Sequence, residues 1–126
     1  MEKKKILVVE DDKFSFKLYT HLLTEAGYEV ASTPRASEAF DLAKQFNPAL
    51  VIADLMLQDG NGFDVIKKLR QTEQFKNTPI ITLSNLGQDA DKKEALKVGA
   101  DKYFVKSNTR FQEIIATIEE MLKAKE

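Results

Sequence analysis

Short runs of apolar residues alternate with longer amphipathic segments along the chain. Five runs have the length of a β-strand and span residues 6–9, 28–31, 49–53, 80–83 and 103–105. Between them, apolar residues recur at the three- and four-residue spacing of a helix with one buried face. The pattern therefore predicts a strand followed by a helix five times over, which is typical of an α/β domain with a parallel sheet.

The runs differ in how continuously apolar they are. The first, third and fourth have consecutive apolar positions, as expected for strands covered by helices on both faces. Residues 28–32 instead alternate between apolar and polar side chains, which suits an edge strand. With the second and fifth strands at the edges and right-handed crossovers, the predicted order is 2-1-3-4-5 in a doubly wound, flavodoxin-like three-layer α/β/α fold.

Capping and turn residues mark the ends of several predicted helices. Thr33 suits an N-cap with Pro34 at the first helical position, so a helix is expected to begin there. Residues 109–112, Thr-Arg-Phe-Gln, fit a capping box at the start of the last helix. Gly27 and Gly99 each end a helical segment just before a strand, where left-handed backbone is expected.

Composition narrows the class of protein. A chain of 126 residues is the usual size of one domain, so we expect a single domain over residues 1–126. It has no cysteine and no apolar run long enough to span a membrane, which favours the cytoplasm. The net charge of -1 provides no overall field to attract nucleic acid or an anionic membrane. Neither is therefore an expected partner.

Polar side chains follow four of the five predicted strands. The first strand is followed by Glu10, Asp11 and Asp12, the third by Asp54, the fourth by Ser84 and the fifth by Lys106. Because the carboxyl ends of parallel strands meet at one edge of the sheet, we expect these side chains to converge. Clustered carboxylates repel one another unless a cation binds, and Mg²⁺ favours a few carboxylates together with a phosphate.

Taken singly, these residues have simpler interpretations. Asp12 alone is best interpreted as a helix cap, Ser84 as a capping hydroxyl and Lys106 as a surface residue. Together, their charges balance around one cation and one phosphoryl group. A carboxylate can attack phosphorus when the charge of the transferring group is neutralised, and Mg²⁺, Lys106 and the Ser84 hydroxyl would neutralise it. The set predicts a phosphoryl-accepting site.

Four segments resemble the receiver domains of response regulators in two-component signalling, over essentially the whole chain. They are Ile-Leu-Val-Val-Glu-Asp-Asp at 6–12, Asp-Leu-Met-Leu at 54–57 with Gly62 beyond, Pro-Ile-Ile-Thr-Leu-Ser at 79–84, and Tyr-Phe-Val-Lys at 103–106. The resemblance implies that Asp54 is the phosphoacceptor. It also implies that Mg²⁺ is held by Glu10, Asp11, Asp54 and the backbone carbonyl of Met56.

The same resemblance assigns roles to three further residues. Ser84 and Lys106 would each bind a phosphoryl oxygen, and Tyr103 is similar in position to the aromatic residue that turns inward when such a domain switches. An edge-strand aromatic that half covers the core is an equally good interpretation of Tyr103. The implied protein is no enzyme beyond catalysing its own phosphorylation and dephosphorylation.

The implied partners are a histidine kinase or histidine phosphotransfer protein and a downstream protein target. The segment after Asp12 carries more apolar residues than one buried face needs, and exposure of Phe14 or Phe16 would support docking of a helical partner there. A homodimer through the last helix and fifth strand is kept as a further hypothesis.

Three positions depart from the usual pattern of the family. Gln58 stands where proline is common, which is expected to loosen the loop after Asp54. Asn85 replaces a small residue beside Ser84, and its bulk is expected to slow the access of water or a phosphatase. Ser107 replaces a proline whose bond is typically cis, so the Lys106–Ser107 bond is either trans or held cis by its surroundings.

These departures keep an alternative open, in which the chain is a receiver-like interaction module that acts independently of phosphorylation. A flavin-binding protein fits less well, because three acids follow the first strand where a phosphate-binding loop would be needed. A phosphatase of the haloacid dehalogenase type would have its nucleophile after the first strand, whereas Asp54 follows the third.

Overall fold

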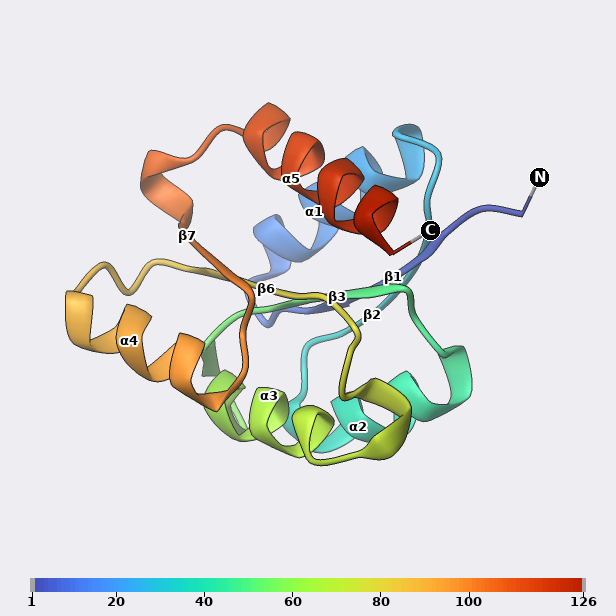
Figure 1. Cartoon of the computed structure of the whole chain (residues 1–126). Coiled ribbons are helices and arrows are strands. Elements are labelled where there is room, and N and C mark those ends of the chain that lie inside the picture. Colours follow the sequence, from blue (N-terminus) through green and yellow to red (C-terminus); the bar gives the residue numbers. More distant parts are fainter. Residues whose placement is uncertain (1, 126) are drawn as a thin grey trace.

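A five-stranded parallel sheet forms the centre of the computed structural model, which describes residues 2–125 (Figure 1). Its strands are β1 (Lys5–Val9), β2 (Glu29–Thr33), β3 (Leu50–Ala53), β6 (Ile80–Ser84) and β7 (Lys102–Val105). They lie in the order β2-β1-β3-β6-β7, and every neighbouring pair is parallel. Because β6 and β7 are the fourth and fifth strands of this sheet along the chain, the predicted order 2-1-3-4-5 is confirmed.

Helices cover both faces of this sheet. In Figure 1, α1 (Lys13–Glu25) and α5 (Phe111–Ala124) lie above it, while α2 (Ala36–Phe46), α3 (Gly62–Arg70) and α4 (Asp89–Val98) lie below. Two 3₁₀ turns, Glu73–Phe75 and Lys106–Asn108, precede β6 and follow β7. The three-layer doubly wound architecture is therefore as predicted.

Two apolar clusters, one on each side of the sheet, form the core. Successive residues of β1 point to opposite faces, so Ile6 and Val8 pack toward α1 and α5, while Leu7 and Val9 pack toward α2, α3 and α4. All four are buried. Full burial of a large aliphatic side chain contributes about 1.5–3 kcal/mol, which explains why the central strands are apolar at consecutive positions.

A short antiparallel hairpin between β3 and α3 was not predicted. It consists of β4 (Met56–Leu57) and β5 (Gly60–Asn61). The next residue, Gly62, lies so close to the backbone of Asp54 that a Cβ there would overlap the Asp54 carbonyl group. Glycine is thus required for the chain to pass behind Asp54.

Two of the predicted helix caps, at Thr33 and at residues 109–112, were wrong. α2 begins at Ala36 after Arg35, and Thr33 is the last residue of β2. The backbone N–H groups of Ala36 and Ser37 are bound instead by a side chain of the hairpin, which no local pattern would reveal.

The capping box at 109–112 does not form. The Thr109 hydroxyl donates to the Val105 carbonyl at 2.8 Å, so it is not free to cap α5, which begins at Phe111. The prediction for the two glycines is confirmed, because Gly27 and Gly99 have φ of 99° and 126°.

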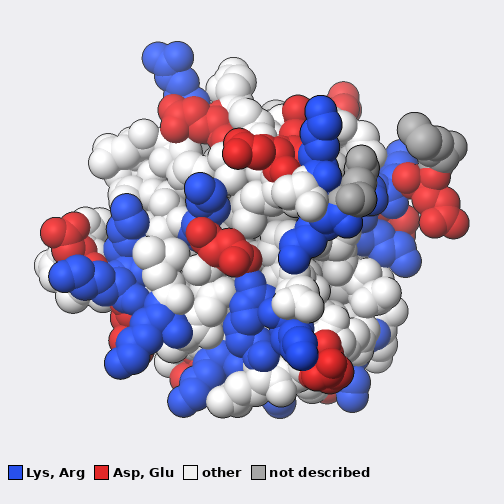
Figure 2. All heavy atoms as spheres, viewed as in Figure 1, with Lys and Arg blue, Asp and Glu red and all other residues white. Residues whose placement is uncertain are grey.

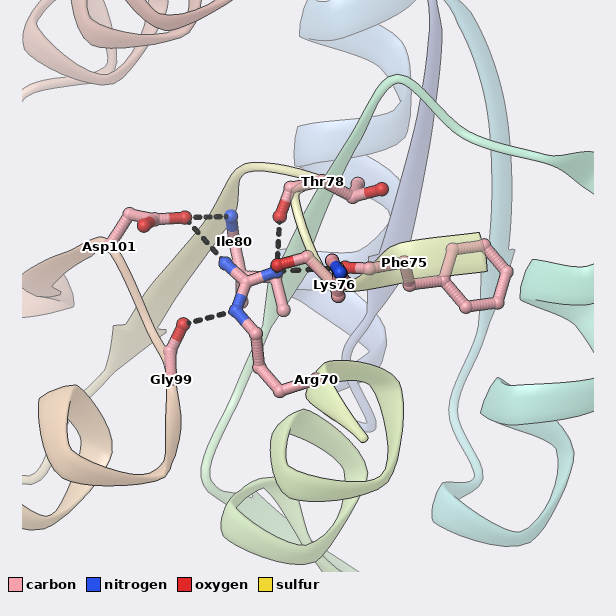
Figure 3. A network of polar contacts seen from close by, with 7 residues as sticks. All are labelled: Arg70, Phe75, Lys76, Thr78, Ile80, Gly99 and Asp101. Carbon is pink, nitrogen blue, oxygen red and sulfur yellow. Dashed lines mark hydrogen bonds and ion pairs between the residues drawn. The ribbon is translucent and has the colours of Figure 1, made fainter. Parts of the chain in front are cut away.

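At the amino ends of β6 and β7, Arg70 of α3 joins several segments (Figure 3). Its guanidinium donates to four backbone carbonyls: Phe75 at 2.9 Å, Lys76 at 3.4 Å, Thr78 at 2.6 Å and Gly99 at 2.8 Å. It also forms an ion pair with Asp101 at 2.7 Å, and the same Asp101 oxygen accepts from the N–H of Ile80 at 2.8 Å. Arg70 thus ties α3 to the starts of two strands.

Charges of both signs cover the face seen in Figure 2. Lys and Arg gather in its lower half, over α3 and α4, and Asp and Glu are more frequent near α5. The surface in this view is therefore a mixture rather than one continuous field. Within residues 2–125, no helix has the length and apolar character needed to cross a membrane.

Candidate functional site

Three acidic side chains meet at the carboxyl ends of β1 and β3. Glu10, Asp11 and Asp54 each place a carboxylate oxygen within 4.8 Å of the others. Glu10 and Asp54 are only 2% and 6% exposed, whereas Asp11 is half-buried. The structure therefore brings together the three acids that the sequence predicts as metal ligands.

Backbone hydrogen bonds that continue the sheet hold two of these acids in place. The N–H of Glu10 donates to the Thr33 carbonyl at 3.1 Å, and the N–H of Asp54 donates to the Val9 carbonyl at 2.9 Å. Each acid therefore extends the ladder of a central strand by one residue, and its position is fixed by the sheet rather than by a loop.

Lys106 reaches into the same cluster from the end of β7. Its ammonium lies 3.0 Å from Oδ2 of Asp54 and forms a second ion pair with Oε1 of Glu10. The Lys106 side chain is 9% exposed. The residues described by the structure contain no cis peptide bond, so Lys106–Ser107 is trans, and Lys106 nevertheless contacts Asp54.

The charges in this cluster do not balance, and the pKa values reflect it. Burial, reinforced by the charge of Asp54, raises the pKa of Glu10 to about 7, although the Lys106 ammonium opposes the change. Burial alone would lower the pKa of Lys106, but its bonds to Glu10 and Asp54 hold the pKa above the usual range. The ammonium therefore stays charged, and the cluster can take up a further cation or a proton.

The donor set fits Mg²⁺. This ion prefers oxygen ligands, keeps several waters and binds through one or two carboxylates together with phosphate oxygens. Glu10, Asp11 and Asp54 are candidate carboxylate ligands. Met56 lies beside them, since its N–H donates to Oδ1 of Asp54 at 3.2 Å, and its backbone carbonyl remains a candidate fourth ligand.

Asp12, the third acid after β1, has a different place. It is exposed, and Oδ2 accepts from the N–H of Ser15 at 2.9 Å as the N-cap of α1. That hydrogen bond lowers its pKa. The interpretation of Asp12 as a helix cap is confirmed.

Ser84 and Tyr103 meet at the loop after β6 rather than at the acids. Ser84 is buried, and its hydroxyl accepts from the N–H of Leu86 at 3.3 Å. The Tyr103 hydroxyl donates to the carbonyl of the same residue. Leu86, which the sequence interpretation missed, therefore links the predicted phosphoryl-binding serine to the predicted switch aromatic.

Asp59 is a second residue that the sequence interpretation missed. It lies between the two strands of the hairpin and binds the start of α2. The Asp59-Gly60 pair is a typical turn signal and would have located the hairpin, although not its contact with α2.

Comparison with known proteins agrees with this geometry. The family model of the response regulator receiver domain matches residues 6–119. The chain therefore belongs to the receiver domain family of response regulators in two-component signalling.

Individual relatives are similar over nearly their whole length. The polar-differentiation response regulator DivK of Brucella ovis is 32% identical over 114 residues, which are 89% of this chain and 93% of DivK. The chemotaxis response regulator CheY4 of Vibrio cholerae has a TM-score of 0.87 at 28% identity, covering 95% of this chain and 99% of that one. The activated N-terminal receiver domain of RstA from Klebsiella pneumoniae has a TM-score of 0.88 at 28% identity, covering 94% and 98%.

Proposed function

We propose that this domain accepts a phosphoryl group from a phosphohistidine onto Asp54 in a Mg²⁺-dependent reaction, and that the transfer changes its affinity for a downstream protein. The observation that carries the proposal is the meeting of Glu10, Asp11 and Asp54 around one point, with the Lys106 ammonium 3.0 Å from Asp54. An interaction module independent of phosphorylation would not need this cluster of buried charges.

In the transfer, a carboxylate oxygen of Asp54 attacks phosphorus, the P–N bond breaks, and its electron pair returns to the imidazole of the donor. Lys106 binds an oxygen of the transferring group through a charge-assisted hydrogen bond. Glu10, Asp11, Asp54 and the Met56 carbonyl would hold Mg²⁺, which would supply further neutralisation of this charge. Attack by water on the aspartyl phosphate later releases inorganic phosphate and restores the Asp54 carboxylate.

The signal is passed on through the loop after β6. In the proposed switch, the Ser84 hydroxyl turns to a phosphoryl oxygen and its bond from the Leu86 N–H is lost. Leu86 also accepts from Tyr103, so a shift of this loop changes the position of the aromatic ring. The surface around β7 and α4 would then present a different shape to a partner.

The phosphohistidine protein is proposed to dock on the first turns of α1. Phe14 is 75% exposed and Leu18 is 38% exposed, and their four-residue spacing places them on one face of the helix. α1 begins directly after the acidic residues that follow β1, which places its first turn beside the carboxyl ends of the central strands. A helix of the donor protein with complementary apolar residues suits this surface.

Phosphorylation by a small donor tests the proposal without the cognate kinase. The parent and Asp54→Asn are incubated with acetyl phosphate, with and without Mg²⁺, and intact mass is measured. We expect a gain of one phosphoryl group in the parent alone and only with Mg²⁺. Asp41→Asn, which removes an exposed acid on α2, serves as the charge-matched control and should be phosphorylated like the parent. No gain in the parent would favour the interaction module.

A further inference from the structure

The hairpin that follows Asp54 carries Met56, the candidate backbone ligand. Only two residue pairs hold its strands together, Met56 with Asn61 and Leu57 with Gly60. A hairpin this short is not stable on its own. Its conformation must therefore be fixed by contacts with the rest of the fold.

Asp59 makes such contacts with the start of α2. Its Oδ1 accepts from the N–H of Ala36 at 2.7 Å, and its Oδ2 accepts from the N–H of Ser37 at 3.2 Å and from the Ser37 hydroxyl at 2.6 Å. These N–H groups have no partner within the helix. The bond from the Ser37 hydroxyl, followed by that from Ala36, lowers the pKa of Asp59, so the carboxylate is charged at neutral pH.

Two neighbouring features support a specific fit. Arg35, the N-cap residue of α2, makes no side-chain capping bond, and the N–H of Ala36 is instead bound by a residue 23 positions beyond it in the chain. At Gly60, an added Cβ would lie 3.0 Å from the Cβ of Ala36, so the hairpin rests directly against the helix.

We propose that Asp59 is a positioning residue, which fastens the hairpin to α2 and thereby holds the Met56 carbonyl in place for the metal ion. The inference rests on the proposed function, because it assumes that Met56 is a ligand. It also bears on Gln58, where the family resemblance led us to expect proline. Asp59 is the residue next to Gln58, and its hydrogen bonds to α2 restrict the loop that Gln58 was expected to loosen.

Hydrogen exchange in the metal-free protein tests the clamp itself. Amide exchange across residues 55–62 is compared by NMR in the parent, Asp59→Ala, Asp59→Asn and Asp41→Asn, with EDTA present. We expect about tenfold faster exchange in Asp59→Ala, a smaller change in Asp59→Asn because one carbonyl acceptor remains, and no change in Asp41→Asn. Unchanged exchange in Asp59→Ala would overturn the proposal. Circular dichroism confirms that each variant is folded.

Mg²⁺ affinity, measured by calorimetry, tests the positioning role. We expect the Kd to rise about threefold to tenfold in Asp59→Ala, less in Asp59→Asn, and to stay within a factor of two in Asp41→Asn. Faster exchange with an unchanged Kd would overturn the positioning role. A parent that binds no Mg²⁺ would refute the proposed metal site instead, and the exchange data would still decide whether the clamp exists.

Discussion

Two long cationic side chains, those of Arg70 and Lys106, lie at opposite ends of the same sheet, and their surroundings differ. At the amino ends of β6 and β7, Arg70 donates to backbone carbonyls and pairs with the single carboxylate of Asp101. At the carboxyl ends of β1 and β3, Lys106 lies between two buried carboxylates. At the first end the charges match and every guanidinium nitrogen donates at least one hydrogen bond, whereas the second end keeps an excess of negative charge.

The difference separates a residue that holds the fold together, Arg70, from one that is proposed to take part in phosphoryl transfer, Lys106. A planar guanidinium with several fixed donors suits a permanent joint between segments. In the proposed transfer, an ammonium on a flexible stem, shared by two carboxylates, would exchange a carboxylate oxygen for a phosphoryl oxygen. The two ends should therefore respond oppositely to mutation.

The largest expected effect is on phosphorylation when Lys106 is removed. In Lys106→Met, the rate of phosphorylation by acetyl phosphate should fall by about 100-fold, because one charged donor to the transferring group is lost. Intact mass followed over time measures the rate. A rate within threefold of the parent would contradict the proposed role of Lys106.

Removal of Arg70 should affect stability instead. Arg70→Met should lower the free energy of unfolding by about 2–4 kcal/mol, because partly buried carbonyls and Asp101 lose their donors. Urea unfolding measures the change, and the phosphorylation rate per folded molecule should be unaffected. Lys76→Met, which breaks only the exposed pair with Glu73, is the control and should change stability by less than about 0.5 kcal/mol. A similarly small change in Arg70→Met would refute the role of Arg70 in joining α3 to β6 and β7.

Only the carboxyl end should make stability depend on pH near neutrality. The pKa of Glu10 is raised to about 7 in the fold from an ordinary value of 4.5, so the folded state holds this proton more tightly than the unfolded state does. The contribution is complete below pH 4.5 and is lost as pH rises through 7. In EDTA, urea unfolding should show a loss on the order of 2 kcal/mol between pH 5 and pH 8. Glu10→Gln should flatten this slope, and an equal slope in both proteins would exclude Glu10 as its source.

The smallest expected effect is the stabilisation of the fold by Mg²⁺ binding. Mg²⁺ at ten times its Kd should stabilise the parent by about 1.4 kcal/mol, seen as a rise in Tm. Asp11→Asn should show little of this rise in Tm. Asp101→Asn, at the other end of the sheet, should show the same rise from a lower Tm in the absence of Mg²⁺. Equal rises in all three proteins would place the ion elsewhere.

The parts of this structure that follow from local pattern were predicted from the sequence. Consecutive apolar residues in β1 and β3 indicated burial on both faces, and the strand ends then brought Glu10, Asp54 and Lys106 together. The start of α2 was not predictable, because its cap comes from Asp59 in a distant hairpin. The Arg70 joint was missed for the same reason, since its carbonyl partners carry no signal in their side chains.

Gly62 limits which neighbours of Asp54 can vary. Its lack of a side chain makes room for the carbonyl group of the proposed phosphoacceptor, so even one added methyl group would displace that backbone. Shape as well as charge is therefore fixed around the acid. A designer who wishes to tune the lifetime of the proposed phosphorylated form has freer positions at Gln58 and Asn85, whose side chains are exposed.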